Sequence, residues 1–456
     1  MYPNQAGKLY HVFNKGKAGI SKMASLSRSK RSWIAVIACA AGVFWPGAFI
    51  FGFPGVMGEI WKEMFNAGRA ETSRIVMFSL IALGSLGYIC GRFQRKYGTK
   101  VCFNIGTVFT VLSLLISLLA KSIYMVYIWA FLNGIAITFI YSPALSTVQK
   151  WVPHHKGFVS GIVSMLFGIS AAIMSPVFKL MLSGLGYVKM HIVLIGLVLV
   201  FNSIAAYFCE APEHARLSER QSKEQEKLLT GTATKNPAGF GSGIKPVQTG
   251  SAVKTIPFWC LCAIWVFMGA AGISMVSIPT AYSASIGLSG GVTILSAYNI
   301  TNGLSRIVVG VLFDKIGGRI TGFFAFILAA AGFFGLIFAQ SFVLILILVM
   351  AVGLGFGTLF AISPPMISTI YGASNFGTIF GLVFMSYGFL GGFLGPYLYG
   401  IVFQTTGSYV PVFIYLGIFA FLSAVLVIFI KPLKQRSISA KKAPRIIYRE
   451  QVSKSA

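Results

Sequence analysis

Apolar runs of about 20 residues recur along the chain and are separated by short polar turns. An α-helix of this length crosses the hydrocarbon core of a bilayer. The pattern predicts an all-α membrane protein with twelve transmembrane helices. Their expected bounds are 33–55, 72–91, 101–120, 122–149, 157–184, 189–209, 256–279, 291–313, 320–339, 341–363, 376–402 and 409–430.

The longest polar stretch between these runs divides them six and six. We expect a basic N-terminal tail (1–32), a six-helix bundle (33–209), a central loop (210–255), a second six-helix bundle (256–430) and a basic C-terminal tail (431–456). The halves resemble each other at an offset of about 220 residues, since Gly91–Lys100 matches Gly310–Arg319 and Ser142–Pro143 matches Ser363–Pro364. Two pseudo-symmetric halves are typical of secondary transporters, which bind substrate between them.

Composition supports a membrane protein, because only 10% of the residues are charged and 56% are hydrophobic, whereas soluble domains are about 25% charged. The net charge of +27 does not indicate nucleic-acid binding, because lysines and arginines concentrate on alternate sides of the predicted helices. The exceptions are Lys62, Arg69, Arg74, Lys121, Lys179, Lys189 and Arg306. This distribution predicts a multi-pass protein of the plasma (inner) membrane with both termini cytoplasmic.

The sequence contains no constellation that indicates an enzyme. It lacks a P-loop, a G-x-S-x-G elbow and an H-E-x-x-H zinc motif. The six cysteines show no metal-ligand spacing with histidine. The histidines, among them His191, are interpreted as lying in loops or at helix ends. We therefore expect no catalytic residue, metal or cofactor, and a monomer whose partners are a small anion and the lipid bilayer.

Arg306 lies well inside the predicted helix 291–313. A charge at that depth costs at least ~2.5 kcal/mol unless it faces a cavity or a partner. The predicted spans contain no Asp or Glu in their interiors, so a substrate anion is the natural counter-ion. A guanidinium matches a carboxylate bidentately. The alternative is a structural cation that donates to backbone carbonyls.

Further candidates for the substrate site are polar or aromatic residues within the predicted helices. Asn299 and Asn302 share a helix face with Arg306. We expect one of three roles for them: to orient Arg306, to contact the substrate, or to hydrogen-bond to a neighbouring helix. The remaining candidates are Tyr298, Tyr141 and Tyr387, for which packing is the alternative role, and Trp45, for which contact with lipid or packing is the alternative role.

The turn GVLFDKIGGR resembles the cytoplasmic loop motif of the major facilitator superfamily, G-x-L-x-D-R/K-x-G-x-R/K. The first copy, GRFQRKYGTK, has Arg95 where the motif has its acid. The resemblance implies a conformational gate on the cytoplasmic side. We expect Asp314 and the basic residues of both copies to make its contacts, with gating residues Asp314, Gly310, Arg319, Gly91 and Arg95.

The segments FLNGIAITFIYSPA, VQKWVPHHKGFVSGI, TIPFWCLCAIWVFMGAAGISM and YGASNFGTIFGLVFMSYGFLGG resemble the oxalate/formate antiporter family, which is related to the monocarboxylate transporters. The resemblance implies that Arg306 holds a substrate carboxylate. Oxalate exchangers of that family use a second cation, a lysine, where this chain has Tyr387. Monocarboxylate transporters place an aspartate where this chain has Asn302.

These features predict a secondary active transporter of small organic anions that works by alternating access, through exchange or symport. One buried cation suits a monoanion better than a dianion, so a monocarboxylate such as formate or lactate is the first expectation and oxalate the second. Two alternatives stay open. One is a porter of an inorganic anion such as nitrate, and the other is a transport-inactive sensor of the same fold.

Overall fold

The computed structural model describes residues 28–212 and 249–431, apart from 68, 277 and 289. Every regular element in these ranges is a helix. The two predicted tails and the predicted central loop lie almost entirely outside the described residues. Only 28–32, 210–212, 249–255 and 431 of them belong to the described part.

The first half begins with a long bent crossing and continues with four further helices. The crossing consists of α2 (Arg28–Gly42), α3 (Phe44–Gly47), the π-helical turn η1 (Ala48–Gly52) and α4 (Phe53–Phe65). It extends well past the predicted end at residue 55. Pro46 and the π-helical turn account for the bend, because both interrupt the regular backbone hydrogen bonds. The other helices are α5 (Arg69–Tyr97), α6 (Thr99–Leu118), α7 (Ile123–Trp151) and α8 (Lys156–Phe208).

The 53 residues of α8 form two crossings rather than one. Gly186 breaks the helical backbone, with φ 77° and ψ 171°. A residue with a Cβ rarely adopts this conformation, so glycine permits a sharp reversal here. The break agrees with the predicted gap between 157–184 and 189–209.

The second half contains the remaining helices. They are α10 (Thr249–Ala252), α11 (Ile256–Ser274), α12 (Ile278–Ser285), α13 (Gly291–Ile316), α14 (Gly318–Leu336), α15 (Phe342–Tyr371), α16 (Phe376–Ser386), the π-helical turns η2 (Tyr387–Gly391) and η3 (Phe393–Tyr397), α17 (Leu398–Thr406) and α18 (Val410–Ile428). The segments α16 to α17 form one continuous crossing.

Ten helices of the described part are long and apolar enough to cross a membrane. α13 is not among them, although its 26 residues are sufficient in length. Its polar residues, among them Asn299, Asn302 and Arg306, lower its hydropathy. Counting α8 as two crossings and adding α13 gives the twelve that the sequence predicts.

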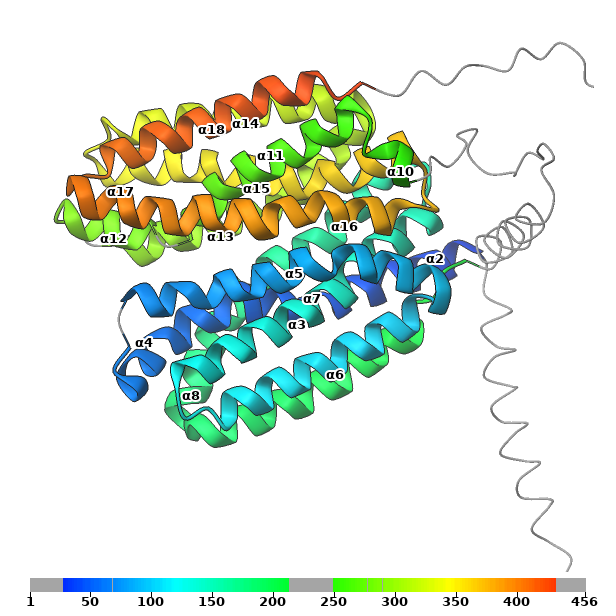
Figure 1. Cartoon of the computed structure of the whole chain (residues 1–456), viewed down its shortest axis with the longest axis horizontal. Coiled ribbons are helices and arrows are strands. Elements are labelled where there is room, and N and C mark those ends of the chain that lie inside the picture. Colours follow the sequence, from blue (N-terminus) through cyan, green and yellow to red (C-terminus); the bar gives the residue numbers. More distant parts are fainter. Residues whose placement is uncertain (1–27, 68, 213–248, 277, 289, 432–456) are drawn as a thin grey trace, which may run out of the picture.

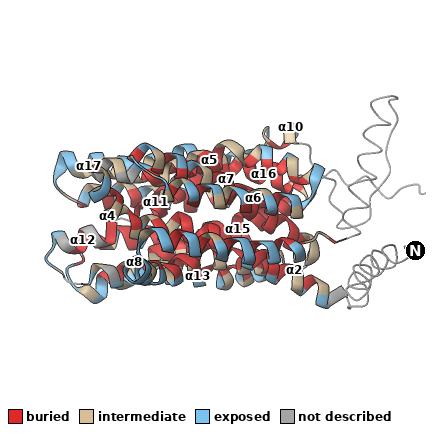
Figure 2. Ribbon diagram, turned by 90° about the horizontal axis from the view of Figure 1, so that it is seen from below, coloured by how far each residue is buried: buried red, intermediate tan, exposed pale blue. Residues whose placement is uncertain are grey.

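The crossings form two bundles that lie side by side, the first half below and the second above in Figure 1. α2 begins and α18 ends at the same end of the molecule, which we call the terminal end; the opposite end is the far end. Buried residues fill the interior, and exposed ones cover the outside (Figure 2). The exposed surface includes large apolar side chains such as Tyr124, Phe338 and Leu180, which suits contact with lipid.

The repeated turn has the same backbone conformation in both halves. Gly98, between α5 and α6, has φ 86° and ψ 173°. Gly317, between α13 and α14, has φ 82° and ψ 156°. These values lie in a region that glycine adopts far more readily than other residues. The repeat seen in the sequence is therefore also a structural repeat.

Glycines bring the two halves into close contact from the terminal end to the middle of the molecule. A Cβ added to Gly91 would collide with the backbone of Gly377, and one added to Gly157 would collide with the carbonyl oxygen of Gly310. Further from the terminal end, a Cβ on Gly87 would lie 2.9 Å from the Cα of Gly381. Small residues allow such backbone contact between membrane helices.

Candidate functional site

Arg306 lies in the middle of α13 and is completely buried. Its Nε donates to the backbone oxygen of Asn302 at 3.2 Å, and its Nη2 donates to Asn302 Oδ1 at 3.1 Å. Its Nη1 donates to the backbone oxygen of Ser164 at 2.7 Å. Ser164 belongs to α8 in the first half, so the guanidinium joins the two halves.

Two neighbours fix the plane of the guanidinium. Its Cζ lies 4.3 Å from the centre of the Phe360 ring, in a cation–π contact. On α8, a Cβ added to Gly168 would lie 2.9 Å from the same Cζ. Gly168 therefore leaves the space that allows the guanidinium to approach α8.

The asparagines and Tyr298 of α13 have different surroundings. Asn302 is buried and orients Arg306 through both of its oxygens, the first of the roles predicted for it. Asn299, which lies about one helical turn from Asn302 toward the far end, is half-buried. Tyr298 is fully buried, and its hydroxyl donates to the backbone oxygen of Gly272 on α11 at 2.6 Å. This contact lies within the second half and favours a packing role for Tyr298.

An aromatic cluster surrounds the buried arginine. Tyr141 of α7 lies over Phe167 at 4.5 Å and within 6.4 Å of Phe360. Its hydroxyl hydrogen-bonds to the hydroxyl of Ser164 at 3.1 Å, next to the carbonyl that Arg306 contacts. Tyr141 therefore lies near Arg306, and its role in substrate binding stays a prediction. The other rings of the cluster are Trp265, Phe380, Phe384 and Tyr387.

Tyr387 and Trp265 are buried donors without a partner. Tyr387 is 1% exposed and Trp265 is 0% exposed. Among the residues that the structure describes, neither the Tyr387 hydroxyl nor the Trp265 Nε1 has a hydrogen-bond partner. Tyr387 begins the π-helical turn η2, and such turns are frequent at functional sites. The sequence predicted a role for Tyr387 but not for Trp265, which lies in a uniformly apolar helix.

Trp45 lies in a different cluster. It stacks on Phe49 at 5.7 Å and contacts Phe201 of the second arm of α8. These contacts lie within the first half and correspond to the packing alternative. From the same bent crossing, Phe51 contacts Phe167 at 5.6 Å and so adjoins the aromatic cluster. Helical periodicity in the sequence could not show that Phe51 rather than Trp45 adjoins the aromatic cluster, because both residues lie where the helix is bent.

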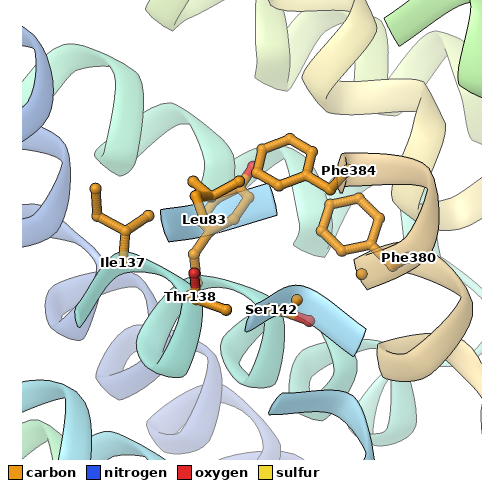
Figure 3. Close-up of a pocket in the computed structure, with 9 residues that line it drawn as sticks. Leu83, Ile137, Thr138, Ser142, Phe380 and Phe384 are labelled. Carbon is orange, nitrogen blue, oxygen red and sulfur yellow. The ribbon is translucent and has the colours of Figure 1, made fainter. Parts of the chain in front are cut away.

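A small cavity lies between the halves beside Tyr141, with a volume of about 10 Å³, enough for about one water molecule. Figure 3 shows Leu83 of α5 and Ile137, Thr138 and Ser142 of α7 on one side of it. Phe380 and Phe384 of α16 close the other side. The hydroxyl of Ser142 is buried and has no hydrogen-bond partner within the described part of the chain.

Asp314 joins the halves near the terminal end. Its Oδ1 accepts from the backbone N–H of Gly157, and its Oδ2 accepts from that of Phe158, each at 2.9 Å. Both N–H groups belong to the first turn of α8, where the helix dipole favours a negative charge. The partners of Asp314 are backbone amides of the other half, and the gating role expected of Asp314 and the basic residues of both motifs stays a prediction.

Two basic residues make other contacts across the same gap. Arg95 Nη1 donates to Asn375 Oδ1 at 2.6 Å, so the arginine that replaces the motif's acid bonds a neutral side chain. Lys156, which the sequence did not single out, donates to Ser368 Oγ at 3.2 Å. Arg319 is exposed. Gly91 and Gly310 contribute through the backbone contacts described above.

His191 lies near a helix end, as the sequence predicts, but its burial was not expected. It is completely buried in the second arm of α8. Its Nε2 lies 2.9 Å from Ser117 Oγ, and its Nδ1 lies 2.8 Å from the backbone oxygen of Tyr187. The sequence did not reveal its burial, since His191 follows Lys189 near a turn.

Comparison with known families identifies the chain. The family model described as Major Facilitator Superfamily matches residues 32–295 and 260–453. The chain belongs to the major facilitator superfamily. It is accordingly a multi-pass membrane protein of a family of transporters, with the twelve-helix fold of that family.

Individual relatives are distant. The chain is 23% identical to the oxalate:formate antiporter of Oxalobacter formigenes over 231 residues, 50% of each chain. It is 22% identical to monocarboxylate transporter 2 of Homo sapiens over 397 residues, 83% of this chain and 80% of the relative. Among solved structures, the proton:xylose symporter XylE bound to 6-bromo-6-deoxy-D-glucose matches with a TM-score of 0.67 and 12% identity. That match covers 89% of this chain and 97% of the symporter and shows the fold.

Proposed function

We propose that this superfamily member is a secondary active transporter of small organic monoanions, with a monocarboxylate as substrate and Arg306 as its binding cation. The observation that carries the proposal is a fully buried guanidinium between two bundles, with no carboxylate among the partners of its hydrogen bonds. A guanidinium has five N–H groups. Three are used within the protein, which leaves two for a substrate carboxylate.

The relatives agree with this substrate class. One is named an oxalate:formate antiporter and another a monocarboxylate transporter. The second cation expected for an oxalate exchanger is absent at Tyr387, which is neutral. A dianion beside a single guanidinium would leave one charge unpaired in a low-dielectric interior, at considerable cost. A monoanion is the better fit.

The two six-helix halves are proposed to move as units during transport. The observed conformation is closed at the terminal end, because Asp314, Arg95 and Lys156 bond across the halves there. In alternating access the halves separate at one end and then at the other around a central site. Opening toward the terminal end requires that these bonds and the glycine contacts be broken.

The terminal end is proposed to face the cytoplasm. The turns there carry Arg95, Lys96, Lys100, Lys315 and Arg319, which fits the preference of basic loops for the cytoplasmic side. The protein would then reside in the cell membrane with both termini inside. We propose that it works as a monomer, by exchange or symport, and catalyses no chemical reaction.

The test is uptake of labelled lactate, formate, oxalate and nitrate into proteoliposomes that contain the full-length protein. Arg306→Lys keeps the charge but loses the planar fork. We expect it to reduce uptake of the preferred monocarboxylate at least about tenfold, the effect of about 1.4 kcal/mol, and Arg306→Ala to abolish it. Lys121→Ala, at an exposed position of the far end, is the control. Uptake of nitrate alone, or undiminished uptake in both Arg306 variants, would contradict the proposal.

A further inference from the structure

The buried imidazole of His191 has a hydrogen-bond partner at each ring nitrogen. Its Nδ1 lies 2.8 Å from the backbone oxygen of Tyr187, which only accepts, so this nitrogen carries the proton of the neutral ring. Its Nε2 lies 2.9 Å from Ser117 Oγ and accepts from that hydroxyl. The observed packing therefore satisfies the neutral imidazole completely.

The surroundings of the imidazole provide no negative charge for a protonated ring. Its other contacts are the rings of Phe53 at 5.7 Å and Tyr187 at 4.4 Å. The further titratable side chains that the structure describes on the surrounding helices do not contact it. They are Lys62 and Glu63 of α4, Tyr124 and Tyr127 of α7, and Lys179 and Lys189 of α8. An imidazolium here would be a buried charge without a counter-ion, which is costly unless water reaches it.

Two unpaired indole groups lie around the same phenylalanine. Trp61 lies 6.0 Å and Trp129 5.5 Å from Phe53, and both indoles are completely buried. Neither Nε1 has a hydrogen-bond partner among the described residues. An indole N–H only donates, and native structures contain few unpaired buried donors. These two groups would therefore gain from the same change that an imidazolium requires, the entry of water.

The helix α4 is the part of this cluster that can admit water. It carries Phe53 and Trp61, and it follows the π-helical turn η1, where the first crossing bends. It also contains Gly55 and Gly58, where a Cβ would have nothing within 4 Å. One side of α4 is therefore open. His191 itself lies only about 7 Å of helix from the break at Gly186, close to the exposed turn of the far end.

We propose that His191 is a proton-binding site whose protonation displaces α4 and admits water to the far end of the first half. The inference goes beyond the proposed function, because it requires no particular substrate. Histidine changes its charge between about pH 5 and pH 8, so the displacement occurs on acidification. Phe51 of the same crossing contacts Phe167 at 5.6 Å. This contact connects the displaced crossing to the aromatic cluster around Arg306.

The experiment measures labelling of Met57→Cys by N-ethylmaleimide in proteoliposomes that contain the full-length protein. Met57 of α4 is completely buried in the same apolar cluster as Phe53 and Trp61. Peptide mass spectrometry quantifies the label. Each rate is divided by the rate for the unfolded protein at the same pH, because a thiol reacts more slowly in acid. We expect the normalised rate to rise about tenfold between about pH 8 and about pH 5.5.

The chain provides matched controls. Cys102 is equally buried but lies near the terminal end of α6, so it should stay protected at both pH values in the same sample. His191→Gln keeps a hydrogen-bonding side chain that does not titrate, and it should abolish the rise at position 57. His154→Gln, at an exposed position, should retain the rise.

A constant rate at position 57, an equal rise in His191→Gln or a parallel rise at Cys102 would overturn the inference. If His191→Gln does not reconstitute, hydrogen–deuterium exchange at the imidazole C2 position of His191 reports its titration in the Met57→Cys protein. The midpoint of that titration should coincide with the midpoint of labelling, and separate midpoints would also overturn the inference. Because neither readout uses a substrate, failure here leaves the proposed carboxylate transport intact, and failure of carboxylate uptake leaves the proton site intact.

Discussion

The Nη1 atom of Arg306 donates to the backbone oxygen of Ser164 at 2.7 Å, and this bond links the second half to the first. In the proposed function, a carboxylate bound at the two remaining N–H groups draws the guanidinium toward itself and away from that oxygen. Because a charged acceptor binds the guanidinium more strongly than a neutral carbonyl, substrate binding weakens the link. On this proposal, Arg306 connects occupancy of the site to the separation of the halves.

Gly168→Ala tests the space around this link. The added Cβ would lie 2.9 Å from Arg306 Cζ, closer than a stable contact allows, so the guanidinium must move away from α8. We expect substrate affinity to fall about tenfold or more, the effect of losing one hydrogen bond to a charged group. Equilibrium binding to the purified protein measures it. Gly196→Ala, where nothing lies within 4 Å, should bind normally; equal loss in both variants would remove Gly168 from the site.

Asp314→Asn tests the contact at the terminal end. Asparagine replaces one of the two accepting oxygens with an NH2 group, which cannot accept from an α8 N–H, and the negative charge at the helix start is lost. The equilibrium should shift toward the state open at the terminal end, slowing transport about tenfold while substrate affinity changes little. A thiol reagent should label the Ser142→Cys variant faster, because position 142 lines the cavity between the halves. Lys315→Gln is the adjacent control, and a collapse of affinity would place Asp314 nearer the substrate.

Gly91→Val tests the glycine contact between α5 and α16. The larger side chain collides with the backbone of Gly377, so the closed terminal end cannot form without displacement of a helix. We expect Gly91→Val to slow transport and to speed the labelling of Ser142→Cys by a thiol reagent. Gly196→Val, where a Cβ would have nothing within 4 Å, is the control and should change neither. Unchanged labelling would show that this contact does not define the closed state.

Tyr387→Lys tests the preference for monoanions. The parent has one buried cation at the site, and the variant adds a second within the same aromatic cluster. We expect oxalate to become the better competitor relative to formate and lactate by about tenfold, with some loss of affinity for the monocarboxylates because the aromatic ring is gone. If the parent already prefers oxalate, or the variant gains nothing for it, Tyr387 does not face the substrate.

The apolar runs and the repeat made the fold predictable. The apolar runs gave the crossings, and GRFQRKYGTK with GVLFDKIGGR gave the relation between the halves. The first crossing was predicted too short, because Pro46 and several glycines resemble an end although the chain continues helically through η1 to Phe65. Hydropathy registers how apolar a segment is and does not register such a bend.

The site was predictable where a polar residue stood out against an apolar background. Arg306 and Asn302 did so, and they hydrogen-bond to each other. Phe360, Trp265 and Gly168 did not, because an aromatic residue or glycine in a membrane helix is common whether or not it adjoins a charge. Ser164 acts through its backbone oxygen, which every residue has. Only the tertiary contacts identify these partners.

The three hydrogen bonds that Arg306 makes within the protein also bear on how the chain is inserted into the membrane. α13 is too polar to count as a membrane-spanning helix by its own hydropathy, and one of the acceptors for its arginine, the Ser164 oxygen, lies in the first half. Since synthesis proceeds from the N-terminus, α8 is already made when α13 leaves the ribosome. The order of the halves along the chain thus makes an acceptor for the cation available before α13 enters the bilayer.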